Sequence, residues 1–450
     1  MRKLLLFISL LFILHASAQT IIKQDAGIKQ MVDEISSKNI EANICKLVSF
    51  KTRHTLSDTT SATQGSGAAR NWIKAEMEKY AAASGGRMTV QFDTFTQPKG
   101  NRIDRPVLLK NVLAVLKGTD PDDTRVYLVS GHYDSRITDP MDANGVEPGA
   151  NDDASGTSVS MELARVMAKR SFPATIIFMT VVGEEQNLNG STHVAARAKA
   201  EKWNIDAMLN NDIVGNTHGI ETDLKDNRSV RVFSEGVPST IAGDKRLVNR
   251  LMLLGAENDS PSRELARYAK EIGERYVDQL DVKLIYRSDR FLRGGDHTSF
   301  LEQGFTAVRF TEMNEDYHRQ HQNIRTENSI EYGDLPDFVD FNYVQKVARL
   351  NASILANLAL APARPENVNV LTRDLTNTTT LKWDAPKNGK KPAGYYILMR
   401  ETISPYWEKK FFVTDTTATL NYSKDNYLFA VQSVDADGHE SLPVFPLPAR

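Results

Sequence analysis

Three short apolar runs alternate with two amphipathic segments in the middle of the chain: VYLVSGH (126–132), SVSMELARVMAKR (158–170), TIIFMTVVG (175–183), STHVAARAKAEKW (191–203) and DAMLNNDIVG (206–215). Continuous apolar runs are typical of strands buried on both faces, whereas the apolar residues of the amphipathic segments recur with helical spacing. We therefore expect an α/β fold whose mostly parallel sheet is covered by helices on both faces. Further strands are expected at 282–287 and 305–310. In such sheets the functional side chains gather at the carboxyl ends of the strands.

The segment before this region completes the expected domain. Residues 25–80 carry apolar positions at three- and four-residue spacings, which predicts helices, and 88–95 and 107–118 predict strands. Cys45 is the single cysteine and lies between apolar neighbours, so we expect a buried, inert thiol. A single cysteine excludes an intrachain disulfide and a cysteine-rich zinc site.

The pattern changes after residue 360. The segment ALAPARPENVNV (359–370) predicts a linker, since its prolines end a helix and favour extended chain. From 365 to 450 we expect short alternating strands that form a small all-β sandwich. This part resembles a fibronectin type III domain, with Trp383 in its core and Tyr427 in its penultimate strand. The predicted domains are therefore 19–360 and 365–450.

The N-terminus has the layout of a signal peptide at 1–18. Two basic residues precede the apolar run LLLFISLLFIL (4–14), which is too short to span a bilayer comfortably, and Ala16-Ser17-Ala18 offers a cleavage site. We expect cleavage after Ala18, export to the periplasm or the medium, and no membrane span in the mature chain. The net charge of −2 and the lack of a Lys/Arg-rich run exclude an evident nucleic-acid-binding surface. The sequence does not indicate the oligomeric state.

Acids and histidines cluster at the ends of the expected strands. The clusters are VSGHYDS (129–135), GANDDASG (149–156), VVGEEQNLNGS (181–191), NNDIVG (210–215) and EDYHRQHQN (315–323). Each alone has an ordinary explanation, because adjacent aspartates often cap a helix and paired glutamates are usually solvated. Together they would bring several carboxylates to one buried edge, where a divalent cation holds them at the least cost. Imidazole and carboxylate without thiolate suit zinc in a hydrolytic site.

These motifs, together with GDHTSF at 295–300, resemble the di-zinc exopeptidases typified by bacterial leucyl aminopeptidases and aminopeptidase Y. Glutamate carboxypeptidase II and glutaminyl cyclase are relatives of that family. The resemblance covers roughly residues 25–360 and is strongest in the motifs. It implies a zinc exopeptidase fold and an aminopeptidase that acts on peptides.

The resemblance also implies a metal site with two zinc ions. His132, Asp152 and Asp212 would bind one ion, and Asp152, Glu185 and a later histidine would bind the other. Asp152 would thus bridge the ions. Two such ions polarise the scissile carbonyl and lower the pKa of a bridging water.

Further residues would complete the catalytic site. Glu184 would be the general base, which takes the proton of the water and later gives it to the leaving amine. Asp134 would accept a hydrogen bond from the second imidazole nitrogen of His132 and so fix its tautomer. The resemblance implies a cis peptide bond between Asp152 and Asp153. Asp296 and His297 would either support the metal site or cap a helix.

Two histidines compete for the last ligand position, His318 and His321. Many relatives have an aromatic-histidine pair here, which favours His318 and would make Tyr317 an oxyanion stabiliser. The branch that this sequence most resembles carries a Gln-His-Gln signature, which favours His321. Side chains three residues apart in an extended loop point to opposite sides, so one of them faces the metal. We assign His321.

Other functions are compatible with the same fold. A glutaminyl cyclase would work with one zinc ion, and a carboxypeptidase or dipeptidase would share the motifs. A non-catalytic binding protein on a peptidase fold would have lost ligand residues, whereas every assigned position here carries one. The motifs do not distinguish a cyclase from a peptidase, and they do not indicate side-chain specificity.

Overall fold

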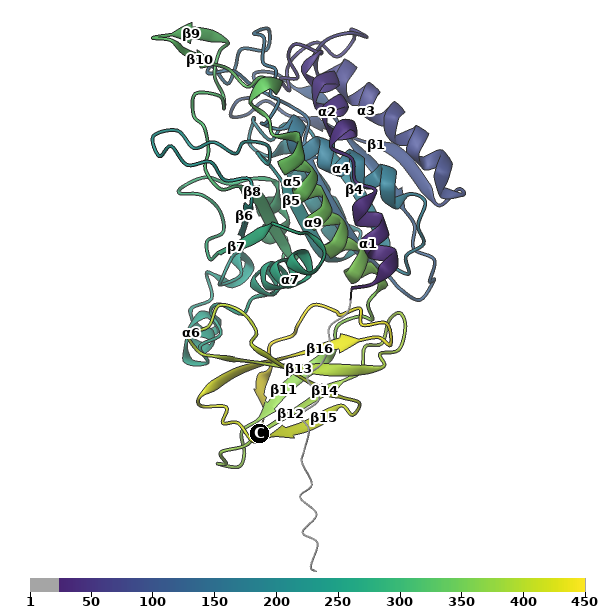
Figure 1. The fold of residues 1–450 in the computed structure, drawn as a ribbon, viewed down its shortest axis with the longest axis vertical. Helices are drawn as coiled ribbons and strands as arrows, with labels where there is room; N and C mark the ends of the chain where they lie inside the picture. Colours follow the sequence, from purple (N-terminus) through teal and green to yellow (C-terminus); the bar gives the residue numbers. More distant parts are fainter. Residues whose placement is uncertain (1–23, 450) are drawn as a thin grey trace, which may run out of the picture.

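The structure is a computed structural model that describes residues 24–449, so the predicted signal peptide lies outside the described residues. Its largest element is an eight-stranded sheet in the order β1-β2-β4-β3-β5-β8-β6-β7 (Figure 1). The strands are β1 (Met88–Gln97), β2 (Val107–Leu116), β3 (Arg125–His132), β4 (Thr175–Val181), β5 (Asn204–Asn211), β6 (Ser229–Phe233), β7 (Asp281–Ile285) and β8 (Ala307–Glu312). The central strands β4, β3, β5 and β8 are parallel, whereas β1 and β2 add an antiparallel edge. Beyond β8, β6 pairs antiparallel with β8 and parallel with β7.

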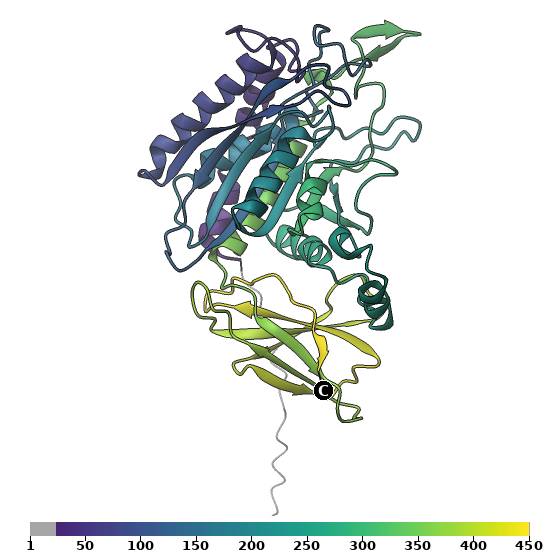
Figure 2. The ribbon, with the colours of Figure 1, turned by 180° about the vertical axis from the view of Figure 1, so that it is seen from behind.

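Helices cover both faces of this sheet, which confirms the predicted fold class. One face packs against α1 (Ala26–Asp33), α2 (Ser37–Val48), α3 (Gly65–Ala81), α4 (Ala154–Met167), α7 (Pro261–Tyr276) and α9 (Phe341–Leu360). The opposite face, seen from behind in Figure 2, packs against α5 (Asn189–Ala200) and α8 (Asp296–Glu302). Strand β4 is apolar throughout because both of its faces are buried. Ile176 and Phe178 enter the core on the first face, and Ile177 and Met179 enter the core on the opposite face.

The expectation of a buried Cys45 is wrong. In α2 the side chains of Ile40, Ile44 and Leu47 point into the core at helical spacing, whereas Cys45 is exposed on the outer face. The apolar neighbours of Cys45 in the sequence therefore belong to the buried stripe of the helix, and Cys45 itself does not.

After α9, the chain forms seven strands in two sheets. One sheet contains β11 (Glu366–Leu371), β12 (Thr379–Asp384), β15 (Thr417–Leu420) and β17 (Leu447–Ala449), and the other contains β13 (Gly394–Glu401), β14 (Lys409–Val413) and β16 (Tyr427–Val434). Residues of both sheets share one apolar core, in which Trp383 is buried and packs edge-on against Tyr395. The assignment of this part to the fibronectin type III fold, and the boundaries at 360 and 365, stay predictions.

The remaining elements are smaller. Helix α6 (Lys245–Leu253) has no buried residues, and β9 (Arg325–Glu327) and β10 (Ile330–Tyr332) form a hairpin that projects from the main body (Figure 1). Short 3-10 turns occur at Ala82–Ser84, Ser239–Ile241 and Pro336–Phe338. Within residues 24–449, no helix has both the length and the apolar character that a membrane crossing needs.

A buried ionic network joins the C-terminal sheets to the large domain. The Asp259 carboxylate pairs with Arg267 of α7 at 2.8 Å and with Arg400 of β13 at 2.8 Å, and all three side chains are almost fully buried. Trp407 donates a hydrogen bond to Glu264 at 2.8 Å, next to this network. Arg267 also pairs with Glu264, whereas Asp259 is the one carboxylate among residues 24–449 that pairs with Arg400. The Arg400 guanidinium has little access to water and therefore depends on the charge of Asp259.

Replacing Asp259 by alanine is expected to lower the free energy of unfolding by about 3–5 kcal/mol, because the buried Arg400 would lose its carboxylate partner and Arg267 would lose one of its two. Urea unfolding followed by circular dichroism measures the change. Asp384→Ala is the matched control, since Asp384 is an exposed aspartate of β12, and we expect a change within about 0.5 kcal/mol. Equal stability of the two variants would show that the network does not stabilise the protein.

Candidate metal centre

The carboxyl ends of three neighbouring parallel strands meet at the centre of the large sheet. His132 is the last residue of β3, Asp212 directly follows β5, and Glu184 and Glu185 lie in the loop after β4. Asp152 lies just before α4, the helix that follows β3 in the chain. Because parallel strands end at the same edge of a sheet, these residues come together although they are distant in sequence.

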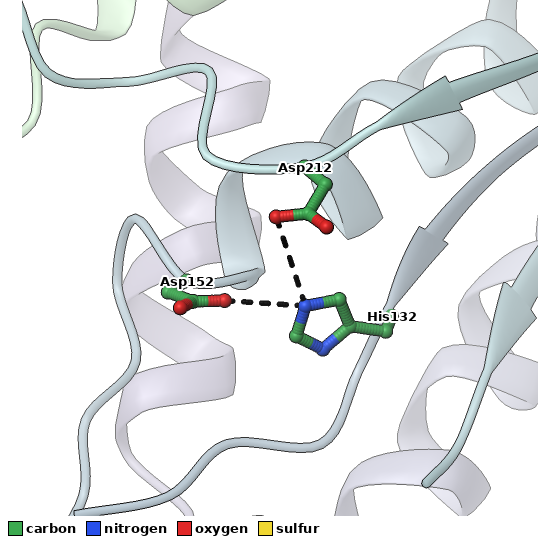
Figure 3. Close-up of side chains that lie close together, drawn as sticks. All are labelled: His132, Asp152 and Asp212. Carbon is green, nitrogen blue, oxygen red and sulfur yellow. Dashed lines mark ion pairs between the residues drawn. The ribbon is translucent and has the colours of Figure 1, made fainter. Parts of the chain in front are cut away.

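The first group of possible ligands contains His132, Asp152 and Asp212, which are all buried (Figure 3). The Nε2 atom of His132 lies 3.2 Å from Oδ1 of Asp152 and 4.0 Å from Oδ1 of Asp212. One donor atom from each residue therefore faces a common point.

The second group contains Asp152, Glu185 and His321. The Nε2 atom of His321 lies 2.8 Å from Oδ2 of Asp152 and 2.8 Å from Oε1 of Glu185. The two oxygens of the Asp152 carboxylate thus face different groups, which is the geometry of a bridging ligand. All five predicted metal residues are brought together in these two groups.

The structure places His318 away from both groups. Its ring packs edge-on against Tyr332, with the ring centroids 5.0 Å apart, and its Nδ1 atom lies 3.7 Å from Oδ1 of Asp316. His321 has a left-handed backbone with φ of 56°, so the loop is not the regular extended segment assumed from the sequence. Tyr317 is 53% exposed, which gives no support for its role as an oxyanion stabiliser.

The residues of both groups fit a bound zinc ion. Nε2 of His132 and Oε1 of Glu185 are buried and make no hydrogen bond with any of residues 24–449, although oppositely charged partners are near. Buried polar atoms that lack a hydrogen bond are uncommon, and here they converge with carboxylate oxygens on the same points. Imidazole nitrogen and carboxylate oxygen without thiolate are ligands that zinc takes in hydrolytic sites.

The electrostatics of the two groups favour positive charge. Burial would lower the pKa of His321, but the charges of Glu185 and Asp152 outweigh it and raise that pKa to about 10. Burial would likewise raise the pKa of Asp152, but the imidazoles of His321 and His132 hold it well below its usual range. The buried carboxylates thus favour positive charge at both groups, which a bound cation would supply.

Glu184 differs from these ligands. It lies at the wall of a cavity of about 350 Å³ that also contacts Asp152, Glu185 and Asp212. Its low-dielectric surroundings raise its pKa well above the ordinary value, and the negative charges of Asp212 and Glu185 add to this rise while His132 opposes it. Glu184 belongs to neither ligand group, so its carboxylate is free to exchange a proton.

Asp134 takes a role that differs from the predicted one. The Nδ1 atom of His132 lies 3.1 Å from the main-chain carbonyl of Asp134, whereas the Asp134 carboxylate is farther away at 3.6 Å. The carboxylate instead accepts hydrogen bonds from the backbone N–H groups of Glu184 and Glu185, at 3.4 and 3.2 Å. Asp134 therefore fixes His132 through its backbone carbonyl and the glutamate loop through its side chain.

The loop that carries Asp152 is tightly constrained. The peptide bond between Asp152 and Asp153 is cis, as the resemblance implies. Gly149 has a left-handed backbone with φ of 52°, and a Cβ atom on Gly156 would lie 2.0 Å from the carbonyl oxygen of Asn211. Ser155 donates a hydrogen bond to the carbonyl of Asn151 at 2.7 Å. These contacts hold α4 close to the end of β5.

Three supporting residues were not predicted from the sequence. Asp334 is buried and accepts a hydrogen bond from the backbone N–H of Asp152 at 2.7 Å. Arg309 is fully buried and lies 2.9 Å from Oδ1 of Asp212. Arg136 pairs with Glu185 at 2.7 Å. Of these three residues, Arg309 could have been found from the sequence. An arginine inside the apolar strand FTAVRF indicates a buried anionic partner.

Asp296 and His297 begin helix α8 and are both fully buried. Burial raises the pKa of Asp296 to about 7. Its neighbour Gly295 approaches the first ligand group, since a Cβ atom on Gly295 would lie 3.4 Å from Oδ2 of Asp212. His297 instead contacts the carbonyl of Ser288 through Nε2 at 2.8 Å. Asp296 thus suits support of the metal site, and His297 holds the loop before α8.

Three carboxylates and two histidines at the carboxyl edge of a mixed α/β sheet form the ligand set of a zinc-dependent hydrolase. The sequence model of peptidase family M28 matches residues 111–337 of this chain. Two fungal relatives are called probable zinc metalloproteases: one from Pyrenophora teres f. teres is 46% identical over 94% of this chain and 88% of its own, and one from Leptosphaeria maculans is 47% identical over 94% and 97%. The chain belongs to peptidase family M28 and is a zinc metallopeptidase.

Solved structures share the fold at lower identity. The LapA aminopeptidase of Legionella pneumophila is 21% identical with a TM-score of 0.54, and the match covers 76% of each chain. A glutaminyl cyclase of Macrostomum lignano is 15% identical with a TM-score of 0.51, and the match covers 75% of this chain and 94% of the cyclase. The fold alone therefore does not distinguish the two activities.

Proposed function

We propose that this zinc metallopeptidase is an exported aminopeptidase that hydrolyses the N-terminal peptide bond of peptides. The observation that carries the proposal is Glu184, which lies at the cavity wall beside two ligand groups that share Asp152. A cavity of about 350 Å³ is at the small end of protein binding pockets and suits a terminal residue better than an extended chain.

Zinc bound at these ligands would polarise the scissile carbonyl and make water a stronger nucleophile. The protein's own residues then handle the protons and the geometry. Glu184 accepts a proton from the attacking water and delivers it to the leaving amine, and its raised pKa makes it a stronger base than a solvated glutamate. Asp134 holds the loop of Glu184 by accepting its backbone N–H.

The main alternatives are a glutaminyl cyclase and a carboxypeptidase or dipeptidase. Two complete ligand groups favour the peptidase, because the family resemblance implies that a cyclase works with a single zinc ion. The presence of every ligand residue also disfavours a non-catalytic binding protein. The proposal includes two bound zinc ions per chain and attack at the N-terminal end of the peptide.

The zinc-loaded protein is expected to release free amino acids from a panel of aminoacyl-anilides, whereas N-terminal glutamine peptides stay uncyclised. Colorimetric release of the aniline and mass spectrometry of the peptides measure the two activities side by side. Blocking the N-terminus by acetylation should abolish hydrolysis if the enzyme is an aminopeptidase. Cyclisation without anilide hydrolysis would show that the protein is a cyclase and not an aminopeptidase. Cleavage of acetylated peptides from the C-terminus would show that it is a carboxypeptidase.

Export is proposed from residues 1–18 and is supported by their basic, apolar and small-residue order. Cleavage is expected after Ala18. Mass determination of the protein recovered from the periplasm or medium of an expressing cell tests this, and an uncleaved chain that stays inside the cell would contradict it.

A further inference from the structure

The cavity above the metal site is lined mainly by charged side chains. Four of its lining residues are arginines, whereas two are apolar: Arg102, Arg136, Arg290, Arg293, Leu188 and Leu292. Leu292 is completely exposed, so it offers little enclosed apolar surface. Because apolar substrate groups gain little from displacing water from guanidinium groups, this lining does not suit a leucine-like side chain.

Two of these arginines are already neutralised by the protein. Arg136 pairs with Glu185 at 2.7 Å and also contacts Nδ1 of His321 at 2.6 Å. The Arg290 side chain is 10% exposed and is held by Asp289 at 3.2 Å and Glu315 at 3.0 Å. Binding a ligand would therefore require either arginine to give up a contact with the protein.

The other two arginines have free capacity. Arg102, in the connection between β1 and β2, donates a hydrogen bond to the main-chain carbonyl of Glu185 at 2.9 Å, and among residues 24–449 it forms no ion pair. Arg293 lies 3.5 Å from Glu315, and its side chain is 36% exposed. Glu315 also pairs with Arg231 and Arg290, so one carboxylate serves three guanidinium groups.

The acids of the cavity do not balance this charge. Asp152, Glu185 and Asp212 face the two ligand groups, and among residues 24–449 no ion pair joins Glu184 to Arg102 or Arg293. Arg102, which has no ion pair among residues 24–449, and Arg293, which shares Glu315 with two other arginines, therefore keep donors available for a ligand. A carboxylate is the group that matches a guanidinium in charge and in the spacing of its oxygens.

We propose that Arg102 and Arg293 bind a carboxylate of the substrate, so that the enzyme prefers peptides carrying a negative charge near the cleaved bond. This inference rests on the proposed peptidase function. The carboxylate has two possible sources with the same chemistry: the acidic side chain of an N-terminal glutamate or aspartate, or the C-terminal carboxylate of a short peptide.

The test compares substrates that differ in one charge. Glutamyl- and glutaminyl-anilide have nearly the same shape, and Ala-Ala and Ala-Ala-amide differ at the C-terminus alone. We expect kcat/KM to favour the charged member of one pair by about 10-fold or more, as a charge-assisted hydrogen bond would give. A preference in the first pair identifies the side chain as the source, and a preference in the second identifies the C-terminus.

The double variant Arg102→Gln, Arg293→Gln should reduce this preference to less than about threefold, while its zinc content stays near that of the wild type. The matched control is Arg105→Gln, since Arg105 lies on the same loop but is exposed and pairs with Asp104. It should keep the full preference. No preference in either pair of substrates, or a preference that survives in the double variant, would overturn the proposal.

A binding measurement separates this inference from the proposed function. The zinc-loaded Glu184→Gln protein is titrated by calorimetry with glutamate, glutamine and the two dipeptides, so no turnover is needed. Tighter binding of a charged member, lost in the Arg102→Gln, Arg293→Gln background, supports carboxylate recognition even if every anilide is left intact and the aminopeptidase proposal fails. Equal affinities within both pairs overturn carboxylate recognition even if anilides are hydrolysed.

Discussion

Replacing Glu184 by glutamine is expected to lower kcat by about 10²–10⁴-fold while the zinc content stays unchanged. Glutamine keeps the shape of the side chain but cannot accept the proton of the attacking water. Glu184 is absent from both ligand groups, so its replacement leaves every donor atom in place. Steady-state hydrolysis of the best anilide and elemental analysis of the same preparation measure the two effects.

The neighbouring variant Glu185→Gln is the control for this result. Oε1 of Glu185 lies 2.8 Å from Nε2 of His321 within the second ligand group, so its loss of charge should weaken zinc binding there. Activity of Glu185→Gln should therefore recover in part when zinc is added in excess, whereas that of Glu184→Gln should not. If Glu184→Gln loses zinc and Glu185→Gln keeps it, the two roles are exchanged.

Replacing His321 by alanine is expected to reduce the zinc content from two ions per chain towards one and to remove most activity. The imidazole supplies the nitrogen donor of the second group, where it faces Asp152 and Glu185 at 2.8 Å. Loss of this ligand leaves two carboxylates to hold the ion, which is one protein ligand fewer than zinc sites in hydrolases usually have.

His318→Ala is the matched control, because His318 is in the same loop and its ring contacts Tyr332 rather than a ligand. This variant should keep both ions and most of the activity. Loss of zinc from His318→Ala, with full zinc in His321→Ala, would move the ligand to His318.

The central sheet could be predicted because its strands are apolar on both faces. Ile176 to Met179 of β4 alternate between the two cores, as expected of a strand that is buried on both faces. The antiparallel pairing of β6 with β8 could not be predicted, since a strand carries no local signal of its direction. Cys45 shows the limit of judging burial from neighbours, because helical periodicity separates adjacent residues.

Much of the candidate site could be predicted because its residues follow strands that had to be buried. His132, Asp212 and the glutamate pair lie directly at these strand ends, so the parallel order of the strands brings them together. His318 and His321 could not be distinguished in this way, since both lie in one loop whose backbone includes a left-handed residue. Arg102 and Arg293 were missed because they lie in polar loops, where arginines are usually solvated.

The most direct test of the account is a zinc titration of the metal-free protein. Exhaustive chelation should abolish hydrolysis of the anilide substrate, and zinc should restore it as the metal content rises to two ions per chain, measured by elemental analysis of the same samples. Two groups of side chains could each hold an ion, and they comprise His132, Asp152, Glu185, Asp212 and His321. Without a bound metal ion, water is too weak a nucleophile at neutral pH. Full hydrolysis by the protein after its zinc has been removed would contradict the account.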